Sequence, residues 1–404
     1  DNNRDIHGPQ PGSNGESEKE VMDLAGGIRA PWRPGEGRLT LLMAANYFLF
    51  LLFFYLLKPA RDSLFLVNLE PAKLPWVYIL TAFLAAPLVG AYVRAGDRMK
   101  LERLTTVAIL TLMVALTLMR LLINVSNGAV YYLFYGLVAV AGGVCISQFW
   151  LIANAVFDSA QARRLFPVLT LGGIFGSFAG GEITGFLVDH GLVDTQDLIL
   201  ASIVVLGIAG MVTVAIWRFN PLEAERPSES LEQDEGGGTL GVLRSVIRSR
   251  HLRLTVIIIS LSVMTGSFVD FQFMNLSWQA FDQQAELTSF LGKFYGRVSL
   301  LTLLVQLVVT PWMLRRLGAG GVLFILPGFL LLGSTFLLVA PGLLAGMLLR
   351  GSEMSLKYSL DKTSRELLFL PVPLALKKRT KLFMDTLVDR LARALAGGLL
   401  LLCT

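Results

Sequence analysis

The chain is poor in the residues from which most catalytic and metal centres are built. Its 404 residues include two cysteines and three histidines. Cys145 and Cys403 both stand in apolar runs, so they indicate neither a disulfide framework nor a CxxC metal site. The histidines lack the spacing of metal ligands, and no HExxH, GxxxxGK[ST] or nucleophile-elbow motif occurs. We therefore expect neither an enzyme nor a bound metal or cofactor.

Charged residues are also scarce, whereas long apolar runs are abundant. Only 16% of the residues are charged and 54% are hydrophobic, although soluble proteins usually carry about 25% charged residues. An apolar run of about 18 or more residues predicts a transmembrane helix. The sequence therefore predicts an all-α membrane protein with eleven visible spans, at residues 39–57, 75–93, 104–124, 130–154, 166–188, 198–217, 254–275, 289–314, 321–338, 343–360 and 382–403.

The loops between these runs differ in charge, and this difference predicts their orientation. Basic loops such as RAGDRMKLER and KKRTK alternate with uncharged or acidic loops such as VSNGA, DHGLVDTQD and DQQAE. Because basic loops stay in the cytoplasm, we expect the N-terminus to be cytoplasmic. The sequence begins with Asp1 and ends within an apolar run. We therefore expect a piece of a longer protein, with a twelfth span beyond Thr404.

A long charged loop divides the predicted spans into two sets. Residues 1–38 are polar and rich in Gly and Pro, which predicts a disordered cytoplasmic tail. We expect an N-terminal six-helix bundle at 39–217, a cytoplasmic central loop at 218–253, and an incomplete C-terminal bundle at 254–404. Two six-helix halves joined in this way resemble the plan of the major facilitator superfamily, whose halves are parallel repeats.

Charged residues of both signs interrupt at least five of the predicted spans. Such residues are costly within the bilayer and usually face a cavity or a partner. A single one, such as Arg350, Glu182 or Arg120, can be interpreted as an internal ion pair or as a side chain that reaches the interface. The whole set favours a polar pathway between two bundles. The set includes Lys58, Arg61, Asp62, Asp270, Lys293, Lys357, Asp361, Asp385 and Arg390.

The first span gives the most specific prediction within this set. Lys58 and Asp62 are four residues apart, so they share one face of a helix, and Pro59 between them predicts a kink. Lys58 and Arg61 are expected to meet an anion. Asp62 is expected to hold them when the site is empty, because a buried charge needs a partner.

The fifth span carries a regular stripe of glycines. Gly172, Gly176 and Gly180 recur at intervals of four residues. This small-xxx-small spacing is typical of membrane helices that cross closely. It predicts close packing, and it does not by itself indicate a role in transport.

Three segments in order resemble the ATP/ADP translocases of the nucleotide transporter family. FWLIANAVFDSAQARRLFP, at 149–167, is similar to that family's FW-x-x-AN followed by A-[KR]-R-x-[FY]-P. SLKYSLDKTSRELLFLPVP, at 355–373, resembles S-K-Y-[AS]-L-F-D-x-T-[KR]-E-x-x-Y-[IV]-P. KRTKLFMDTLVDRLARALAGG, at 378–398, resembles K-x-K-x-x-I-D-x-x-x-x-R-x-[GA]-[KR]. The resemblance covers the chain from about residue 40 to its end.

The resemblance implies a major facilitator-like fold and the exchange of ATP for ADP, or of another nucleotide, without hydrolysis. It implies a divergent bacterial member in the cytoplasmic membrane. Lys58, Lys357, Lys381 and Arg390 would then neutralise phosphates, Asp270 would be the functional acid, and Asn154 would join the substrate-binding set. Two departures leave the nucleotide open: Met274 stands where the family often has lysine, and LKYSLD is one residue shorter than SKYALFD.

Three functions stay open from the sequence. The first is a nucleotide exchanger that works by alternating access. The second is a transporter of another anionic metabolite, coupled to protons through Asp62, Asp270 or Asp385. The third is a non-transporting sensor or anchor for a domain beyond Thr404. The expected partners are a nucleotide or similar anion and the lipid bilayer, and no nucleic acid.

Overall fold

The structure is a computed structural model that describes residue 33 and residues 36–96, 99–125, 127–219, 249–368 and 388–403. Most of the predicted tail at 1–38 and of the predicted loop at 218–253 lies outside the described residues. The site candidates Lys381 and Asp385 lie outside them as well.

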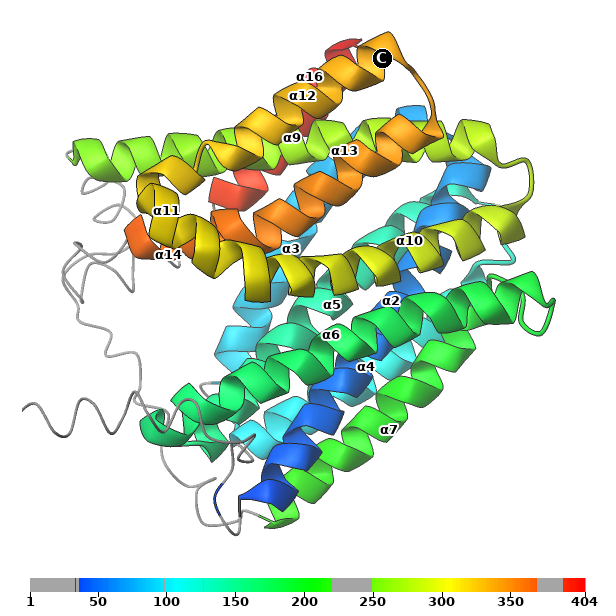
Figure 1. Cartoon of the computed structure of the whole chain (residues 1–404). Helices are drawn as coiled ribbons and strands as arrows, with labels where there is room; N and C mark the ends of the chain where they lie inside the picture. Colours follow the sequence, from blue (N-terminus) through cyan, green and yellow to red (C-terminus); the bar gives the residue numbers. More distant parts are fainter. Residues whose placement is uncertain are drawn as a thin grey trace, which may run out of the picture.

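The first part of the chain forms a group of helices that we call the N-terminal group. Its members are α2 (Gly37–Leu69), α3 (Leu74–Gly96), α4 (Leu101–Leu122), α5 (Gly128–Val156), α6 (Ser159–Asp189) and α7 (Leu198–Phe219). A short 3₁₀ helix, η1 (Pro71–Lys73), joins α2 to α3. Helix α2 packs on α5, α6 and α7, so it lies at the centre of this group (Figure 1).

The remaining helices form what we call the C-terminal group. They are α9 (Arg250–Ala280), α10 (Gln284–Leu304), α11 (Thr310–Val322), α12 (Ile325–Val339), α13 (Leu343–Leu356), α14 (Lys362–Leu368) and α16 (Asp389–Cys403). Two π-helical turns continue these helices without a break. The first, η2 (Val305–Val309), joins α10 to α11, and the second, η3 (Lys357–Asp361), joins α13 to α14.

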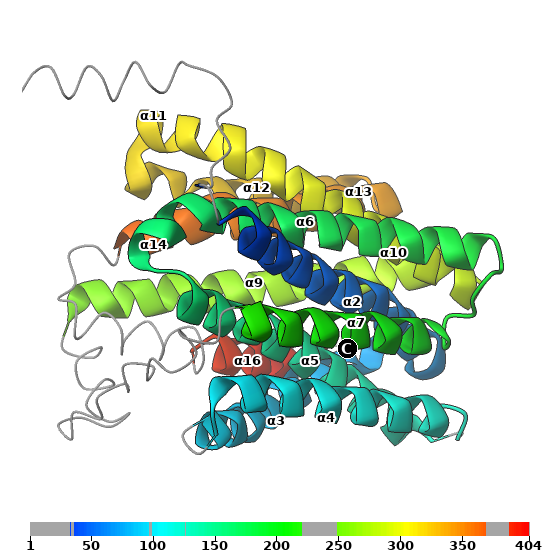
Figure 2. The same ribbon diagram turned by 90° about the horizontal axis from the view of Figure 1, so that it is seen from below.

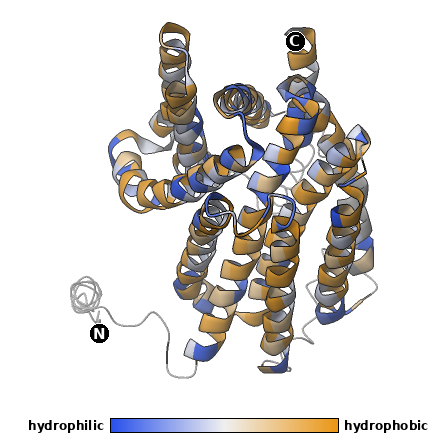
Figure 3. Cartoon of the chain, turned by 90° about the vertical axis from the view of Figure 1, so that its right-hand side faces the viewer, coloured by the Kyte–Doolittle hydropathy of each residue, from blue (hydrophilic) through white to orange (hydrophobic). Residues whose placement is uncertain are grey.

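The predicted all-α membrane fold is confirmed. The described residues contain helices and no strand, and eight helices are long and apolar enough to cross a membrane. The other predicted spans correspond to α3, to α13 with η3 and α14, and to α16. Figure 3 shows that the helices are mostly hydrophobic along their length. Helix α2 runs on through Pro59 as one 33-residue helix.

Helix α6 begins at a strong N-terminal cap. The Asp158 side chain accepts hydrogen bonds from the backbone N–H groups of Ala160 and Gln161, and Gln161 Oε1 accepts one from the Asp158 N–H. This reciprocal capping box satisfies donors that a helix start leaves unpaired. Arg164, one turn later, pairs with Glu36 in front of α2. The backbone N–H of Arg33 and the Arg164 guanidinium lower the pKa of Glu36.

The glycine stripe of α6 packs against the backbone of α2, as its spacing predicts. A Cβ atom on Gly172 would lie 2.6 Å from the Ala44 carbonyl oxygen, and one on Gly180 would lie 3.0 Å from that of Leu52. A Cβ on Gly176 would overlap the Phe48 carbonyl. The two helices can approach this closely only because glycine has no side chain.

The two groups of helices contact each other mainly at one end. The second half of α6 packs on the first half of α10, where Gly181 meets the backbones of Gly292 and Gly296. Helix α16 lies beside α3, with Gly397 against Pro75 (Figure 2). In Figure 1 the ribbons of α6 and α10 run together on the right and separate toward the left. We call the joined end the closed end.

Candidate functional site

Two neighbouring residues of α2 form a buried ion pair beside the closed end. Arg61 Nε and Nη2 donate hydrogen bonds of 2.8 and 2.6 Å to Asp62 Oδ1. The Tyr295 hydroxyl of α10 donates to Asp62 Oδ2 at 3.0 Å, and the Arg61 guanidinium lies 3.9 Å from the centre of the Tyr135 ring. The pair is therefore satisfied within the protein, as a buried charge requires.

Lys58, one turn before this pair, has a different environment. Its ammonium lies 3.3 Å from the centre of the Tyr295 ring and 5.8 Å from that of Tyr55. No carboxylate among the described residues forms a salt bridge with it. The direct bonds of Asp62 go to Arg61 and Tyr295, and its charge acts on Lys58 without a salt bridge. Lys58 is held by aromatic faces, which attract a cation more weakly than a carboxylate does.

The C-terminal group supplies a second set of charges. Arg350 of α13 pairs with Asp270 of α9 and, at 2.7 Å, with Glu353. Lys357 Nζ donates to the other oxygen of Glu353 at 3.0 Å. The Tyr78 hydroxyl of α3 donates to Asp270 Oδ2 at 2.8 Å, so this set also reaches into the N-terminal group.

One face of α9 accommodates this second set. Ser262, Gly266 and Asp270 recur every four residues and so share that face. A Cβ atom on Gly266 would lie 2.6 Å from Glu353 Oε1 and 2.8 Å from Lys357 Nζ. Glycine at this position therefore leaves the room that the two charged side chains occupy.

We call these seven charged residues the central ionic cluster. Its members are Lys58, Arg61, Asp62, Asp270, Arg350, Glu353 and Lys357. The charges of Asp62, Asp270 and Arg350 all act on the Lys58 ammonium, which places the two sets near each other. The cluster has four cations and three carboxylates, and Lys58 is the cation without a carboxylate. Its members come from both groups of helices.

The candidate set from the sequence omitted Arg350 and Glu353, which belong to this arrangement. It also omitted three tyrosines from other helices that contact the cluster, Tyr78, Tyr135 and Tyr295. Arg350 alone could be interpreted as a structural ion pair, and Glu353 showed only helical spacing with Lys357. The signal that could have found them is the spacing of Arg350, Glu353 and Lys357, which places all three on one helical face. The tyrosines gave no signal, because their contacts join helices far apart in the sequence.

Other predicted site residues lie apart from the central ionic cluster. Lys293 pairs with Asp189 where α10 meets the end of α6. Asp361 pairs with Arg365, whose Nη2 also donates to Ser262 at 3.2 Å. The Asn154 amide donates to the Trp150 carbonyl at 2.8 Å within α5. Arg390 lies on α16 beside the Asp389–Arg393 pair.

The two other isolated charges have partners, as the ion-pair interpretation predicts. Arg120 pairs with Asp197 at 2.5 Å, between α4 and α7. Glu182 pairs with Arg297 at 2.8 Å, between α6 and α10. The second pair joins the two groups of helices at the closed end, together with Lys293 and Asp189.

Removing the Arg350 guanidinium is expected to destabilise the protein. Arg350→Met leaves Asp270 and the 2%-exposed Glu353 side chain without their shared cation. Breaking a buried ion pair from one side costs about 3–5 kcal/mol. We expect a clearly lower midpoint of thermal unfolding in detergent, and partial recovery in the double variant Arg350→Met with Asp270→Asn.

Arg120→Met is the matched control, because its ion pair lies at a more exposed site. Exposed pairs contribute about 0–1 kcal/mol, so its unfolding midpoint should stay near that of the native chain. Equal shifts of the unfolding midpoint in the two variants would show that the Arg350 ion pairs stabilise the protein no more than the Arg120 pair does.

Comparisons with known proteins agree with this architecture. A family model described as "TLC ATP/ADP transporter" matches residues 64–402. The "ADP,ATP carrier protein 3" of Rickettsia bellii (strain RML369-C) is 21% identical over 325 residues, which cover 68% of this chain and 63% of the relative. The chain thus spans under two thirds of the length of that relative.

Solved structures show the same fold at low sequence identity. The nucleoside transporter NupG superposes with a TM-score of 0.64 at 14% identity, covering 89% of each chain. A bacterial homologue of the iron transporter ferroportin, in an inward-facing state, superposes with a TM-score of 0.67 at 11% identity, covering 90% of this chain and 91% of that one. The predicted major facilitator-like arrangement is therefore confirmed.

Proposed function

Because the chain belongs to the TLC ATP/ADP transporter family, we propose that it is a membrane carrier that exchanges nucleotides of the ATP/ADP type. The exchange would proceed by alternating access, without hydrolysis. The proposed location is a bacterial cytoplasmic membrane, with the N-terminus in the cytoplasm, as the basic loops predict.

The observation that carries this proposal is the central ionic cluster with its unpaired Lys58. A nucleotide phosphate chain needs several cations, and lysine and arginine are the usual phosphate ligands in proteins. The Lys58 ammonium can donate a hydrogen bond to a phosphate oxygen without losing a carboxylate partner. Arg350 and Lys357 belong to the C-terminal group and share Glu353. Either cation could leave Glu353 and bind a phosphate, because the remaining cation would still be paired with Glu353.

Tyrosine side chains add a second kind of contact to the cluster. The Tyr295, Tyr135 and Tyr78 side chains all contact members of it. Aromatic faces stack on nucleobases, which contributes about 1–3 kcal/mol per base in nucleic-acid complexes. All three rings are buried, and those of Tyr295 and Tyr135 carry the Lys58 and Arg61 cations on their faces, so a base could stack on them only after a cation moves away.

The position of the contacts between the two groups supports alternating access. The closed end contains the acidic loops after α6 and α9, which the positive-inside rule places outside the cell. The state of the structure would then be inward-facing. Transport would require the Glu182–Arg297 and Asp189–Lys293 pairs between α6 and α10 to separate, while the opposite ends approach.

Exchange follows from the charge of the cluster. Four cations face three carboxylates, and among the described residues the Lys58 ammonium has aromatic contacts but no carboxylate partner. A bound anion would compensate this charge while the helices rearrange, so the loaded carrier should cross more readily than the empty one. Uptake should therefore depend on a nucleotide on the opposite side of the membrane.

A transporter of another anionic metabolite is the second candidate. Met274 is buried, 1% exposed, in an apolar cluster with Phe273 and Phe294. The ATP/ADP translocases often have a lysine at this position. Methionine replaces it here, and methionine cannot bind phosphate. This difference favours a substrate with fewer negative charges than ATP.

The experiment is uptake of labelled ATP and ADP into proteoliposomes that are preloaded with nucleotide or left empty. We expect uptake only into preloaded vesicles. Equal uptake into both would contradict obligate exchange. No uptake into either, with uptake of a smaller phosphorylated or carboxylated solute, would favour the second candidate. No uptake of any anion would favour the sensor or anchor role.

A further inference from the structure

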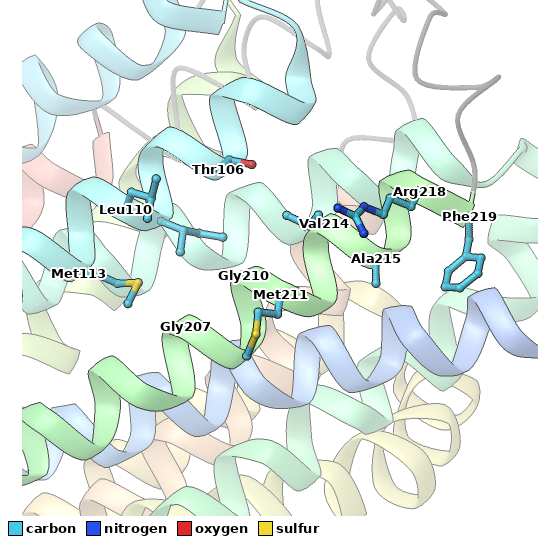
Figure 4. Close-up of a pocket in the computed structure, with 11 residues that line it drawn as sticks. Thr106, Leu110, Met113, Gly207, Gly210, Met211, Val214, Ala215, Arg218 and Phe219 are labelled. Carbon is cyan, nitrogen blue, oxygen red and sulfur yellow. The ribbon is translucent and has the colours of Figure 1, made fainter.

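A groove lies on the outer face of the N-terminal group, away from the central ionic cluster. It is a cavity of about 710 Å³ between α4 and α7 (Figure 4), lined among others by Ile109, Met113, Gly207, Met211 and Arg218. A second cavity of about 340 Å³ shares Leu110 and Met113 with it and reaches Thr117 and Leu118. The two cavities adjoin at Leu110 and Met113, and we call them together the groove along α4.

The dimensions of the groove suit one acyl chain. It follows α4 from Thr106 to Thr117, which at about 1.5 Å per residue is roughly 17 Å. One leaflet of the hydrocarbon core is about 15 Å thick, half of about 30 Å. The rims are exposed apolar side chains, with Leu110 at 55% and Met211 at 66%. A face of this kind meets lipid when the helices span a membrane.

Small residues of α7 keep the groove open. Gly207 and Gly210 line it, and a Cβ atom on either would already lie 3.3 Å from Met113 or Ile109. Behind the groove α7 is fixed to α2, because the Asn46 amide donates to the Ala209 carbonyl and to Thr213. The groove is thus a feature of the packing of α4 against α7.

One end of the groove carries positive charge. Arg218 lines it in the last turn of α7 and is exposed. Phe219, also in the lining, lies under the Arg38 guanidinium at 3.8 Å. No carboxylate in the described part of the chain forms a salt bridge with either arginine. Two guanidinium groups therefore stand where the headgroup of a lipid in the groove would lie.

We propose that this groove binds an anionic phospholipid, with one acyl chain between α4 and α7 and the headgroup phosphate on Arg218. Arginine binds phosphate through paired N–H groups, and basic pockets between helices on the cytoplasmic side bind anionic headgroups. The site rests on the orientation proposed above, which puts Arg218 at the cytoplasmic leaflet. It is independent of the transported substrate.

Native mass spectrometry of the full chain tests the proposal, with phosphatidylglycerol and phosphatidylcholine of equal chain length as probes. We expect retention of one phosphatidylglycerol in preference to phosphatidylcholine. Arg218→Gln should lower the retained phosphatidylglycerol about tenfold, as loss of a charge-assisted hydrogen bond predicts. Met211→Trp, which fills the groove, should lower the retention of both lipids.

Two variants of the same chemistry are the controls. Arg315→Gln removes an exposed arginine of α11, and Leu200→Trp enlarges an exposed residue of α7 outside the groove. Neither should change retention. Phosphatidylglycerol binding that Arg218→Gln and Met211→Trp leave unchanged would overturn the proposal. Competition by glycerol phosphate, which has no acyl chain, at the same concentration would also overturn it, because it would reveal a site for a free phosphate.

Discussion

Nucleotide exchange is expected to fall about ten- to a hundredfold in Lys58→Met, while the protein stays folded. The ammonium of Lys58 contacts aromatic rings and no described carboxylate, so its removal leaves no buried anion unpaired. In the proposed complex the same ammonium binds a phosphate. Hydrogen bonds to charged groups contribute about 1.5–3 kcal/mol, which corresponds to this loss of affinity. Methionine keeps the apolar stem of lysine, so packing is preserved.

Two measurements separate binding from folding in this variant. The initial rate of exchange into preloaded proteoliposomes gives transport. The rise of the thermal unfolding midpoint with added ATP gives binding, since a ligand of the folded state stabilises it. We expect both the rate and the ATP-dependent rise to fall, with an unchanged midpoint in the absence of nucleotide. Lys58→Arg should retain most of both, because it keeps the charge.

Lys73→Met is the matched control, because Lys73 is exposed in η1. It removes the same charge from the same chain without touching the central ionic cluster. It should leave exchange unchanged. Full exchange by Lys58→Met would show that Lys58 does not bind the substrate. The phosphates would then have to bind other cations.

The fold could be predicted from the sequence because each membrane helix carries its own signal. An apolar run of sufficient length must form a helix in the bilayer, whatever it packs against. The glycine stripe of α6 also predicted a close crossing, although it did not identify α2 as the partner. The continuation of α2 through Pro59 was not predicted, since the sequence does not show which neighbours support the backbone there.

The candidate site could be predicted only in part, because it depends on contacts between distant helices. The sequence indicated Lys58, Asp270 and Lys357, and the structure brings these three into one cluster. Lys293 had the same intramembrane signature, yet it pairs with Asp189 at the crossing of α6 and α10. Spacing along one helix cannot distinguish a residue of the central ionic cluster from a residue that forms an ion pair at a helix crossing. The difference lies in the partner, which comes from another helix.

The crossing of α6 and α10 yields the second large effect: Gly181→Ala is expected to impair exchange and to leave binding intact. A Cβ atom on Gly181 would overlap the Gly292 carbonyl oxygen and lie 2.7 Å from Gly296 Cα. Both are backbone atoms, which cannot move aside as a side chain can. Overpacking of this kind costs about 1–3 kcal/mol. This cost destabilises the inward-facing state, in which α6 and α10 are in contact at the closed end. It does not apply to the outward-facing state, in which the two helices must separate there.

Gly143→Ala is the matched control, because a Cβ atom there has no other atom within 4 Å. Both variants replace a helical glycine by alanine, which by itself favours the helix by about 1 kcal/mol. Exchange by Gly143→Ala should therefore equal that of the native chain. Exchange by Gly181→Ala should fall about five- to a hundredfold, with Gly181→Val more severe.

A labelling experiment shows which state Gly181→Ala disfavours. Ser63 is fully buried at the closed end, where its hydroxyl accepts a hydrogen bond of 2.6 Å from Thr288 of α10. In a background with both native cysteines replaced by alanine, Ser63→Cys should react slowly with a membrane-impermeant maleimide added from outside. Adding Gly181→Ala should accelerate this reaction, because the closed end opens more often. Unchanged labelling together with unchanged exchange would mean that α6 and α10 need no close contact during transport, and alternating access would then have to use another pair of helices.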